Sequence, residues 1–178
     1  MFYLCENVKE INLGKLDFSL VTDFSEMLQG CHNLVNIDVT NFNTKNSKSF
    51  YYMFAYCNNL KNIDVSKFNS SKCETIYAMF WDCKSITEID MINWDMSNLK
   101  YEGEYHKDNP IQYLFYNCKN LTKIKISGNL KEEEANKGHS SGIFCSIPQF
   151  GELITKKNVP CNIPLNKYLP QDWTRNKE

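Results

Sequence analysis

The sequence is poor in loop-forming residues and has no long apolar run. Gly and Pro account for only 7 and 5 of its 178 residues, which argues against a linker or a low-complexity chain. No stretch approaches the roughly 20 consecutive apolar residues that a membrane-spanning helix needs. Met1 leads at once into charged sequence, without the apolar region of a signal peptide. We therefore expect no membrane span here, and any export signal would lie outside this chain.

The chain also lacks an excess of positive charge and the common catalytic motifs. Its formal net charge is −1, which argues against binding nucleic acid through electrostatics. It contains no G-x-S-x-G, P-loop or G-x-G-x-x-G motif and no Cys/His cluster with zinc spacing. His139 and Cys145 could be paired as base and nucleophile, but nothing specific supports that pairing. We expect no catalytic residue, no cofactor and no metal site.

The sequence is dominated by an internal repeat of 26 residues. Three kinds of residue recur at this spacing, and each set defines a column, meaning equivalent positions in successive units. The columns are Met1, Met27, Met53 and Met79; Cys5, Cys31, Cys57 and Cys83; and Ile11, Ile37, Ile63 and Ile89. Three columns that keep one period indicate stacked units rather than a chance pattern.

A fifth unit, LFYNCKNLTKIKIS, begins at Leu114, which is 35 residues after Met79. The excess over one period is a nine-residue insertion at 101–109. We therefore divide the chain into a five-unit repeat region, 1–130, and a linker with a C-terminal cap packed on it, 131–178. Four of the five prolines lie in 143–178, so we expect irregular strands in the cap.

Each unit contains one strand. In 60–65, polar residues alternate with apolar ones at the end of the segment, as in a half-buried strand. The equivalent strands are expected near 8–13, 34–39, 86–91 and 121–126, parallel and about 4.8 Å apart. The Met-Phe-x-x-Cys segment reads as a short helix or turn on the opposite side. The predicted class is an α/β repeat: a right-handed solenoid like those of leucine-rich repeats, with a parallel sheet on one face.

Stacking of such units converts columns into buried layers, because one unit cannot cover its own apolar face. Three layers are predicted. They contain Phe2, Leu28, Phe54, Phe80 and Phe115; Ile11, Ile37, Ile63, Ile89 and Ile124; and Leu16, Phe42, Phe68 and Trp94.

The pattern C-x-N-L-x-x-I-D-V-S-x-F-N, followed by M-F-x-x-C, resembles the 26-residue repeat of bacterial surface proteins, a branch of the BspA-like leucine-rich repeats. The resemblance covers about residues 1–130. It implies a surface protein or lipoprotein with a role in adhesion or host interaction. Two features depart from the family: no lipidation signal is present, and 131–178 do not match the repeat.

Five of the eight cysteines, at 5, 31, 57, 83 and 118, occupy one column. A column supplies one residue per unit, so we favour buried, reduced thiols that act as small apolar groups. Cys73 is expected in the core as well. Cys145 and Cys161 are the only plausible disulfide pair.

Two columns are predicted to face solvent along the sheet. They contain Glu10, Asn36, Asn62, Glu88 and Lys123, and Asn12, Asp38, Asp64, Asp90 and Lys125. Stacked carboxylates repel one another. Either Asp38, Asp64 and Asp90 accept hydrogen bonds from nearby Ser or Thr or from loop backbone, or they form an acidic stripe for a basic partner or a cation.

The insertion at 101–109 is the second candidate surface, because insertions into a repeat often lie on the binding face. Tyr101, Tyr105 and His106 are chemically suited to recognition, although a tolerated surface loop explains them equally well. The predicted partner-binding residues are therefore Asn36, Asp38, Asn62, Asp64, Glu88, Asp90, Tyr101, Tyr105 and His106.

The first unit has no cap, so its outer face would expose a pairing edge and an apolar layer. We expect a longer array, a partner or a second copy to cover it. Two functions remain open. One is a protein-recognition module at the cell surface or outside the cell, with a host or matrix protein as partner. The other is an intracellular scaffold of the same fold, which reduced cysteines would suit.

Overall fold

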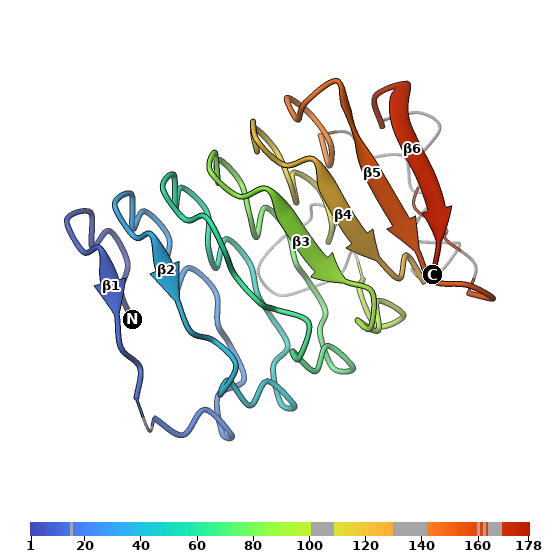
Figure 1. The fold of residues 1–178 in the computed structure, drawn as a ribbon. Helices are drawn as coiled ribbons and strands as arrows, with labels where there is room; N and C mark the ends of the chain where they lie inside the picture. Colours follow the sequence, from blue (N-terminus) through green and yellow to red (C-terminus); the bar gives the residue numbers. More distant parts are fainter. Residues whose placement is uncertain (15, 101–108, 130–141, 160, 162, 164–168) are drawn as a thin grey trace.

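The computed structural model describes the chain except for residues 15, 101–108, 130–141, 160, 162 and 164–168 (Figure 1). Its regular structure is parallel sheet. The strands are β1 (Glu10–Ile11), β2 (Asn36–Ile37), β3 (Glu88–Met91), β4 (Lys123–Ile126), β5 (Phe150–Thr155) and β6 (Asp172–Lys177). No residue of the described part is helical, so the chain is not α/β there, and none of it could cross a membrane as a helix.

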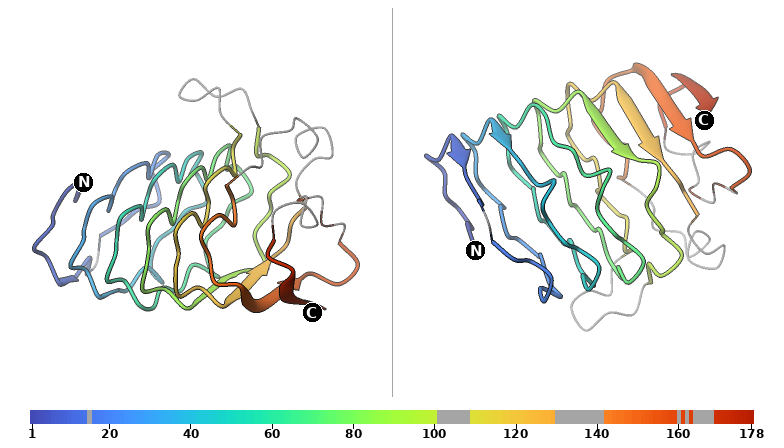
Figure 2. Two further views of the ribbon diagram at one scale, coloured as in Figure 1. Left: turned by 90° about the horizontal axis from the view of Figure 1, so that it is seen from above. Right: turned by 60° about the horizontal axis from the view of Figure 1, so that its bottom comes forward.

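The repeat units form a stack of coils, each contributing its strand to one side (Figures 1 and 2). We number the coils from their first residues: Met1, Met27, Met53, Met79, Leu114 and Ile143. Glu10 pairs with Asn36, and Asn36 with Asn62 through a single bridge, as the columns predict. Glu88 pairs with Lys123, so the strands stay in register although nine residues are inserted between these two units.

The Met-Phe-x-x-Cys segments form tight turns on the side of the coil away from the strands, which we call the turn side. Two columns of non-glycine residues there have left-handed backbone, including Glu26 (φ 56°), Tyr52 (φ 53°), Tyr56 (φ 63°) and Asp82 (φ 61°). Alternate residues donate backbone hydrogen bonds to the next coil, as Phe54 N–H does to the Met79 carbonyl at 3.0 Å. These bonds between coils replace the bonds that a helix would make within one segment.

Short side-chain bonds fix three corners of each of the first four coils. At every corner an Asp, Asn, Ser or Thr oxygen accepts a hydrogen bond from the backbone N–H two residues later, which is the Asx or Ser/Thr turn. Examples from the three corner columns are Asp64 to Ser66 (2.9 Å), Asn69 to Ser71 (3.1 Å) and Thr75 to Tyr77 (3.2 Å). The polar residues of the repeat therefore set where the chain bends.

The phenylalanine layer is confirmed from the second coil onward. Leu28, Phe54, Phe80 and Phe115 are fully buried, whereas Phe2 is only partly buried. The rings of Phe54 and Phe80 stack with centroids 5.6 Å apart and planes 6° apart. The isoleucine layer is buried at Ile37, Ile89 and Ile124 and partly buried at Ile11 and Ile63.

The third predicted layer is wrong in the first coil. Leu16 is 48% exposed, and Phe18 fills its place, with its ring 4.2 Å from that of Phe42. Phe42, Phe68 and Trp94 stack as predicted, and the Trp94 indole N–H donates to the Val65 carbonyl at 2.9 Å. The backbone turn of the first coil is in register with the next, because the Asp17–Ser19 bond matches the Asn43–Lys45 bond, so only the side chain that fills the layer differs.

The cysteine column is a ladder of free thiols. Each thiol donates to the carbonyl of the phenylalanine-layer residue in the previous coil. The pairs are Cys31 to Phe2 (3.1 Å), Cys57 to Leu28 (3.2 Å), Cys83 to Phe54 (3.0 Å) and Cys118 to Phe80 (3.0 Å). Cys73 is buried, and Cys145 and Cys161 are also free thiols rather than a disulfide. The hydrogen bond explains a cysteine at this column in place of another small apolar residue.

The expectation of irregular strands in the C-terminal region is wrong. β5 and β6 have six residues each, and they continue the parallel sheet from β4. The turn side continues as well, because Phe115 N–H donates to the Ile143 carbonyl and the Phe144 ring stacks on Phe115. Residues 143–147 are thus a sixth unit, with Ile143 and Ile147 in the Met and Cys columns. The boundary at 130/131 falls where the described residues are interrupted and remains a prediction.

The ladder thiols are expected to resist modification in the native protein. Burial raises the pKa of Cys31 to about 11 and raises those of Cys57, Cys83 and Cys118 further, so thiolate is scarce at neutral pH. A thiol reagent followed by peptide mass spectrometry should label exposed Cys145 first and the ladder only on unfolding. Equal labelling rates would contradict the ladder. The folded protein holds these thiols in the neutral form, whereas the unfolded chain ionises them above their usual pKa of about 8.5. The free energy of unfolding should therefore fall as pH rises above about 8.5.

Glu26→Gly should stabilise the fold. Glu26 is exposed and left-handed, a conformation that costs an L-residue about 1–2 kcal/mol and glycine almost nothing. The free energy of unfolding from denaturant titration should rise by about 1 kcal/mol. Glu10→Gly, in exposed extended backbone of β1, is the matched control and should lower it. A loss of stability in Glu26→Gly would show that the side chain itself is needed.

Candidate sheet-side site

The predicted sheet columns form an open groove across coils 2 to 4. It has a volume of about 570 Å³. Its lining contains all six partner-binding residues that were predicted on the sheet: Asn36, Asp38, Asn62, Asp64, Glu88 and Asp90. All of these are exposed except Asp90, which is half-buried. We call this feature the sheet-side groove.

The groove lies where the ladder of strands is interrupted. Asn62 bridges back to Asn36, but within the described residues no strand pairing joins coil 3 to β3. The sheet is therefore divided into a two-stranded part, β1–β2, and a four-stranded part, β3–β4–β5–β6. Ile63 is only partly buried beside this interruption. The opening gives the otherwise even face a local recess.

Asp38 and Asp64 are fixed by their own turns. Oδ1 of Asp38 accepts from Thr40 Oγ1 (2.6 Å) and N–H (2.9 Å), and Oδ1 of Asp64 does the same with Ser66. The hydroxyl bonds, followed by the backbone bonds, lower the pKa of both carboxyls. Asp38 and Asp64 thus accept the hydrogen bonds from nearby Ser or Thr and from loop backbone that were one of the two alternatives for these carboxylates. The second oxygen of each carboxylate remains at the surface, so the acidic stripe is compatible with them.

The fourth coil is not part of a free acidic stripe. Lys123 lies 3.1 Å from the Glu88 carboxylate, and Lys125 lies 3.5 Å from Asp90 and 3.2 Å from Glu178. The pairs with Glu88 and Asp90 cross from β4 to β3 in the same register as the strands. Glu10, Asp38 and Asp64 have no such cation among the described residues. The unneutralised part of the predicted stripe of Asp38, Asp64 and Asp90 therefore contains only Asp38 and Asp64.

The other predicted binding residues, Tyr101, Tyr105 and His106, lie outside the described residues. His139, the candidate base for Cys145, lies outside them too. Among the residues that are described, no three His, Cys, Asp or Glu side chains come together as a metal site would require. The contribution of the insertion to binding stays a prediction.

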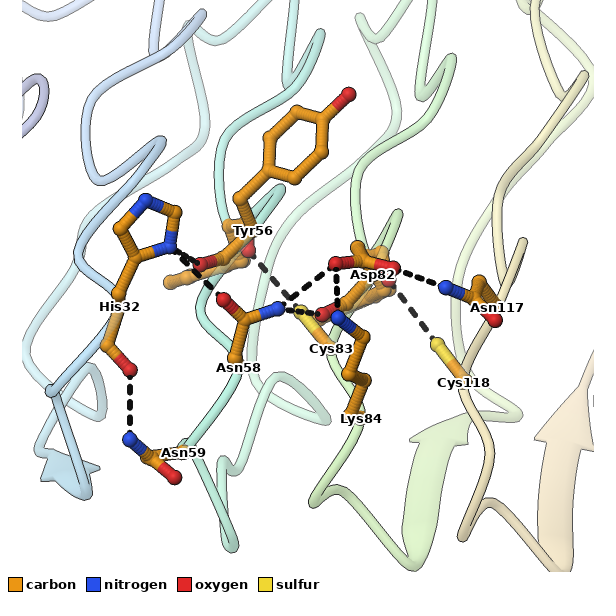
Figure 3. Close-up of polar contacts among 11 residues, drawn as sticks. His32, Tyr56, Asn58, Asn59, Asp82, Cys83, Lys84, Asn117 and Cys118 are labelled. Carbon is orange, nitrogen blue, oxygen red and sulfur yellow. Dashed lines mark hydrogen bonds and ion pairs between the residues drawn. The ribbon is translucent and has the colours of Figure 1, made fainter.

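A polar row on the turn side was not predicted. It runs from His32 through Asn58 and Asp82 to Asn117, one residue per coil (Figure 3). Asn58 Nδ2 donates to Asp82 Oδ2 at 2.8 Å, Lys84 Nζ lies 2.8 Å from the same oxygen, and Asn117 Nδ2 donates to Oδ1. Asp82 is only 9% exposed, so each of these donors offsets the burial of its charge.

The row fixes the tautomer of His32. Because the Asn58 amide nitrogen faces Asp82, its oxygen faces His32 Nδ1 at 2.8 Å. The Tyr56 carbonyl lies 3.0 Å from the same nitrogen. Two acceptors require that Nδ1 carries the hydrogen, which leaves Nε2 facing Glu6 at 4.0 Å. A proton added at Nε2 would complete an ion pair with Glu6.

The sequence offered only weak signals for this row. Asp82 and Asn117 hold the same column, but Tyr56 and Gly30 precede them there, and Asn58 belongs to the column two positions later. His32 and Asn58 share one column, and Asp82 and Asn117 share another, but Asn58 reaches Asp82 diagonally between the two columns, so a search of single columns does not reveal the whole row. Only the stacked structure brings one charge and its three donors together.

Asp82→Asn should destabilise the fold in a pH-dependent way. Burial raises the pKa of Asp82, but the bonds from Lys84, Asn117 and Asn58 together outweigh it and lower the pKa. The stabilisation is present above the unfolded value of about 3.9 and is lost as pH falls through the folded pKa. We expect a loss of about 1 kcal/mol at pH 7 that vanishes in acid.

Denaturant titration across pH measures this difference. Asp172→Asn, an exposed carboxylate in β6, is the control and should behave as wild type. A constant difference between Asp82→Asn and wild type at all pH values would show that packing, not charge, is responsible.

Comparison with known proteins places the chain in a family. No curated protein and no solved structure matches it. The model of one family, described as "Mycoplasma protein of unknown function, DUF285", matches residues 1–120, which include the first four coils and the fifth turn segment. Since the match covers well over half of the 178 residues, the chain belongs to the DUF285 family.

Proposed function

We propose that the chain is a non-catalytic protein-binding module whose sheet-side groove receives a basic segment of a partner protein. The observation that carries this proposal is the groove of about 570 Å³ lined by Asn36, Asp38, Asn62 and Asp64, in which the Asp38 and Asp64 carboxylates form no ion pair with a described residue. Glu10 extends the same charge toward the first coil, where it lines an adjoining recess of about 370 Å³.

Physical arguments support a basic partner over an empty surface. Carboxylates one strand apart repel each other, so a cationic segment laid across them would relieve that repulsion. Thr40 and Ser66 hold Asp38 and Asp64 in fixed positions, so little side-chain entropy is lost on binding. The amides of Asn36 and Asn62 add hydrogen-bonding groups between the charges. Such a contact would be sensitive to salt.

The biological setting follows from the repeat. We infer that the stack is a right-handed, leucine-rich-repeat-like solenoid of the BspA-like kind, with a surface or lipoprotein role in adhesion to a host or matrix protein. The period and the parallel register of the coils support this inference. The alternative is an intracellular scaffold of the same fold, and the free thiols favour that setting.

Self-association is a second candidate activity. Of the six large apolar side chains that are exposed among the described residues, five lie in the first coil (Met1, Tyr3, Leu4, Leu16 and Leu20), and the sixth is Phe150 in β5. β1 pairs only with β2, so its other edge carries unpaired backbone groups. A second copy stacked there would cover both features. Sedimentation of the wild type and of Leu20→Ser at several concentrations tests this, because only the wild type should dimerise.

The sheet-side proposal is tested with a double variant, Asp38→Asn/Asp64→Asn. Because both carboxylates contribute to attraction, capture of a partner from host-cell and matrix extracts should weaken about fivefold or more. A hexalysine peptide serves as a defined probe in titration calorimetry. Thermal unfolding of each variant confirms that it is folded.

Asp17→Asn is the matched control. Asp17 makes the same kind of turn, with Ser19, and hydrogen bonds from Ser19 lower its pKa too, but it lies at another corner of the coil. It should bind as wild type does. Equal binding by the control and the double variant would remove the groove from consideration and direct attention to the 101–109 insertion.

A further inference from the structure

The turn side carries a cluster of aromatic rings at its surface. Coils 2 to 5 contribute Tyr51, Tyr52, Tyr56, Tyr77, Trp81, Tyr113 and Tyr116. Tyr77 is buried, and the others are partly exposed. The rings of the phenylalanine layer, by contrast, are fully enclosed inside the same coils. None of the binding residues predicted from the sequence belongs to this cluster.

Trp81 is the centre of the exposed part. Its ring centroid lies 5.0 Å from those of Tyr113 and Tyr116 and 6.0 Å from that of Tyr56. The ring planes of Tyr113 and Tyr116 lie edge to face, with an angle of 87° between them. Tyr56 projects away from the polar row that lies beneath it (Figure 3). We call these four residues the aromatic face.

The backbone does not require these rings. Tyr56 and Tyr113 occupy left-handed positions, with φ of 63° and 57°, which are costly for bulky residues. In the second coil the column of Tyr56 holds Gly30, which adopts the same conformation without cost. The turn itself therefore does not require a tyrosine at this position. Surface patches rich in Trp and Tyr are typical of recognition sites.

The side chains of the aromatic face are suited to an uncharged ligand that accepts hydrogen bonds. The Asp82 carboxylate, whose charge acts on Tyr56, already interacts with Asn58, Lys84 and Asn117. Tyr hydroxyls and the Trp81 indole N–H remain as donors, and no partner for that N–H occurs among the described residues. Burial, and then the charge of Asp82, raise the pKa of Tyr56, so its hydroxyl stays protonated. A sugar would also need free acceptors, which the engaged carboxylate does not supply.

Polyproline II helices have this complementary chemistry. Their backbone carbonyls have no internal partner, and proline rings pack on aromatic faces. One turn takes three residues of about 3.1 Å, or about 9.3 Å. Backbone bonds from Tyr56 to Trp81 and from Asp82 to Tyr116 join coils 3, 4 and 5. At about 4.8 Å per coil, the step from coil 3 to coil 5 is about 9.6 Å, close to one turn.

We propose that the aromatic face is a docking surface for a proline-rich segment of a partner protein in the polyproline II conformation. Its residues are Tyr56, Trp81, Tyr113 and Tyr116. Prolines three residues apart would seat on either side of Trp81, whose N–H would donate to a carbonyl between them. The site lies on the turn side, so it is separate from the sheet-side groove, and either site can operate without the other.

The probe is a synthetic peptide in which proline recurs every third residue, and its control is the same peptide with alanine at those positions. Trp94 and Trp173 are buried, so a change in tryptophan fluorescence on titration reports mainly on Trp81. We expect saturable binding of the proline peptide and none of the alanine peptide. Raising the salt concentration should leave the affinity unchanged. Binding of both peptides alike, or of neither, would overturn the proposal.

Single substitutions test whether the proline peptide binds at the aromatic face. Trp81→Ala and Tyr116→Ala should weaken binding of a labelled peptide, measured by anisotropy, about tenfold or more. Tyr3→Ala, an exposed tyrosine of the first coil, should have no effect. If an alanine variant does not fold, Trp81→Phe keeps the ring but lacks the N–H, and it should still weaken binding. Wild-type affinity in Trp81→Phe and Tyr116→Ala would refute the assignment.

Two further outcomes separate this site from others. Asp38→Asn/Asp64→Asn should bind the proline peptide as well as wild type, so loss of the sheet-side activity and loss of this one are distinguishable. Binding of an uncharged oligosaccharide in competition with the peptide would show that the rings select sugar faces, and it would overturn the assignment to proline.

Discussion

The hydrogen bonds between coils are the constraint on which the rest of the structure depends. A coil forms few of its backbone bonds within itself; on the strand side β3 pairs with β4, and on the turn side Phe54 donates to Met79. Each coil therefore requires a neighbour in register. That register stacks equivalent residues, so every side chain must be compatible with a near-copy of itself about 4.8 Å away.

Different residue types meet this requirement in different ways. Phenylalanine stacks on phenylalanine, as Phe54 and Phe80 do, and the contact stabilises both. Cysteine donates its thiol to a carbonyl in the coil before it, as Cys83 does to Phe54. Aspartate is harder to accommodate because its charges repel. Thr40 and Ser66 hold the carboxylates of Asp38 and Asp64, whereas the next acids along the sheet are neutralised by lysines of the fifth coil.

The two outer sides of the stack consequently have different chemistry. The strand side presents carboxylates and amides around an interruption in the sheet. The turn side presents tyrosines around Trp81, above the Asp82 carboxylate, which already interacts with Asn58, Lys84 and Asn117. A basic segment suits the first side and an uncharged proline-rich segment suits the second. The rigid stack keeps both surfaces in fixed positions, which lowers the entropic cost of binding.

The sequence by itself determined the period, the parallel register across the insertion, the buried Phe and Ile columns and the reduced cysteine ladder, because each depends on spacing within one repeat. Tertiary structure decided the rest. The turns are left-handed at Tyr56 and Asp82 because bonds to the next coil outweigh local preference. Ile143–Ile147 forms a sixth turn segment because stacking needs only apolar bulk there. The donors around Asp82 and the rings around Trp81 come from different coils, so no single repeat contains the information that places them.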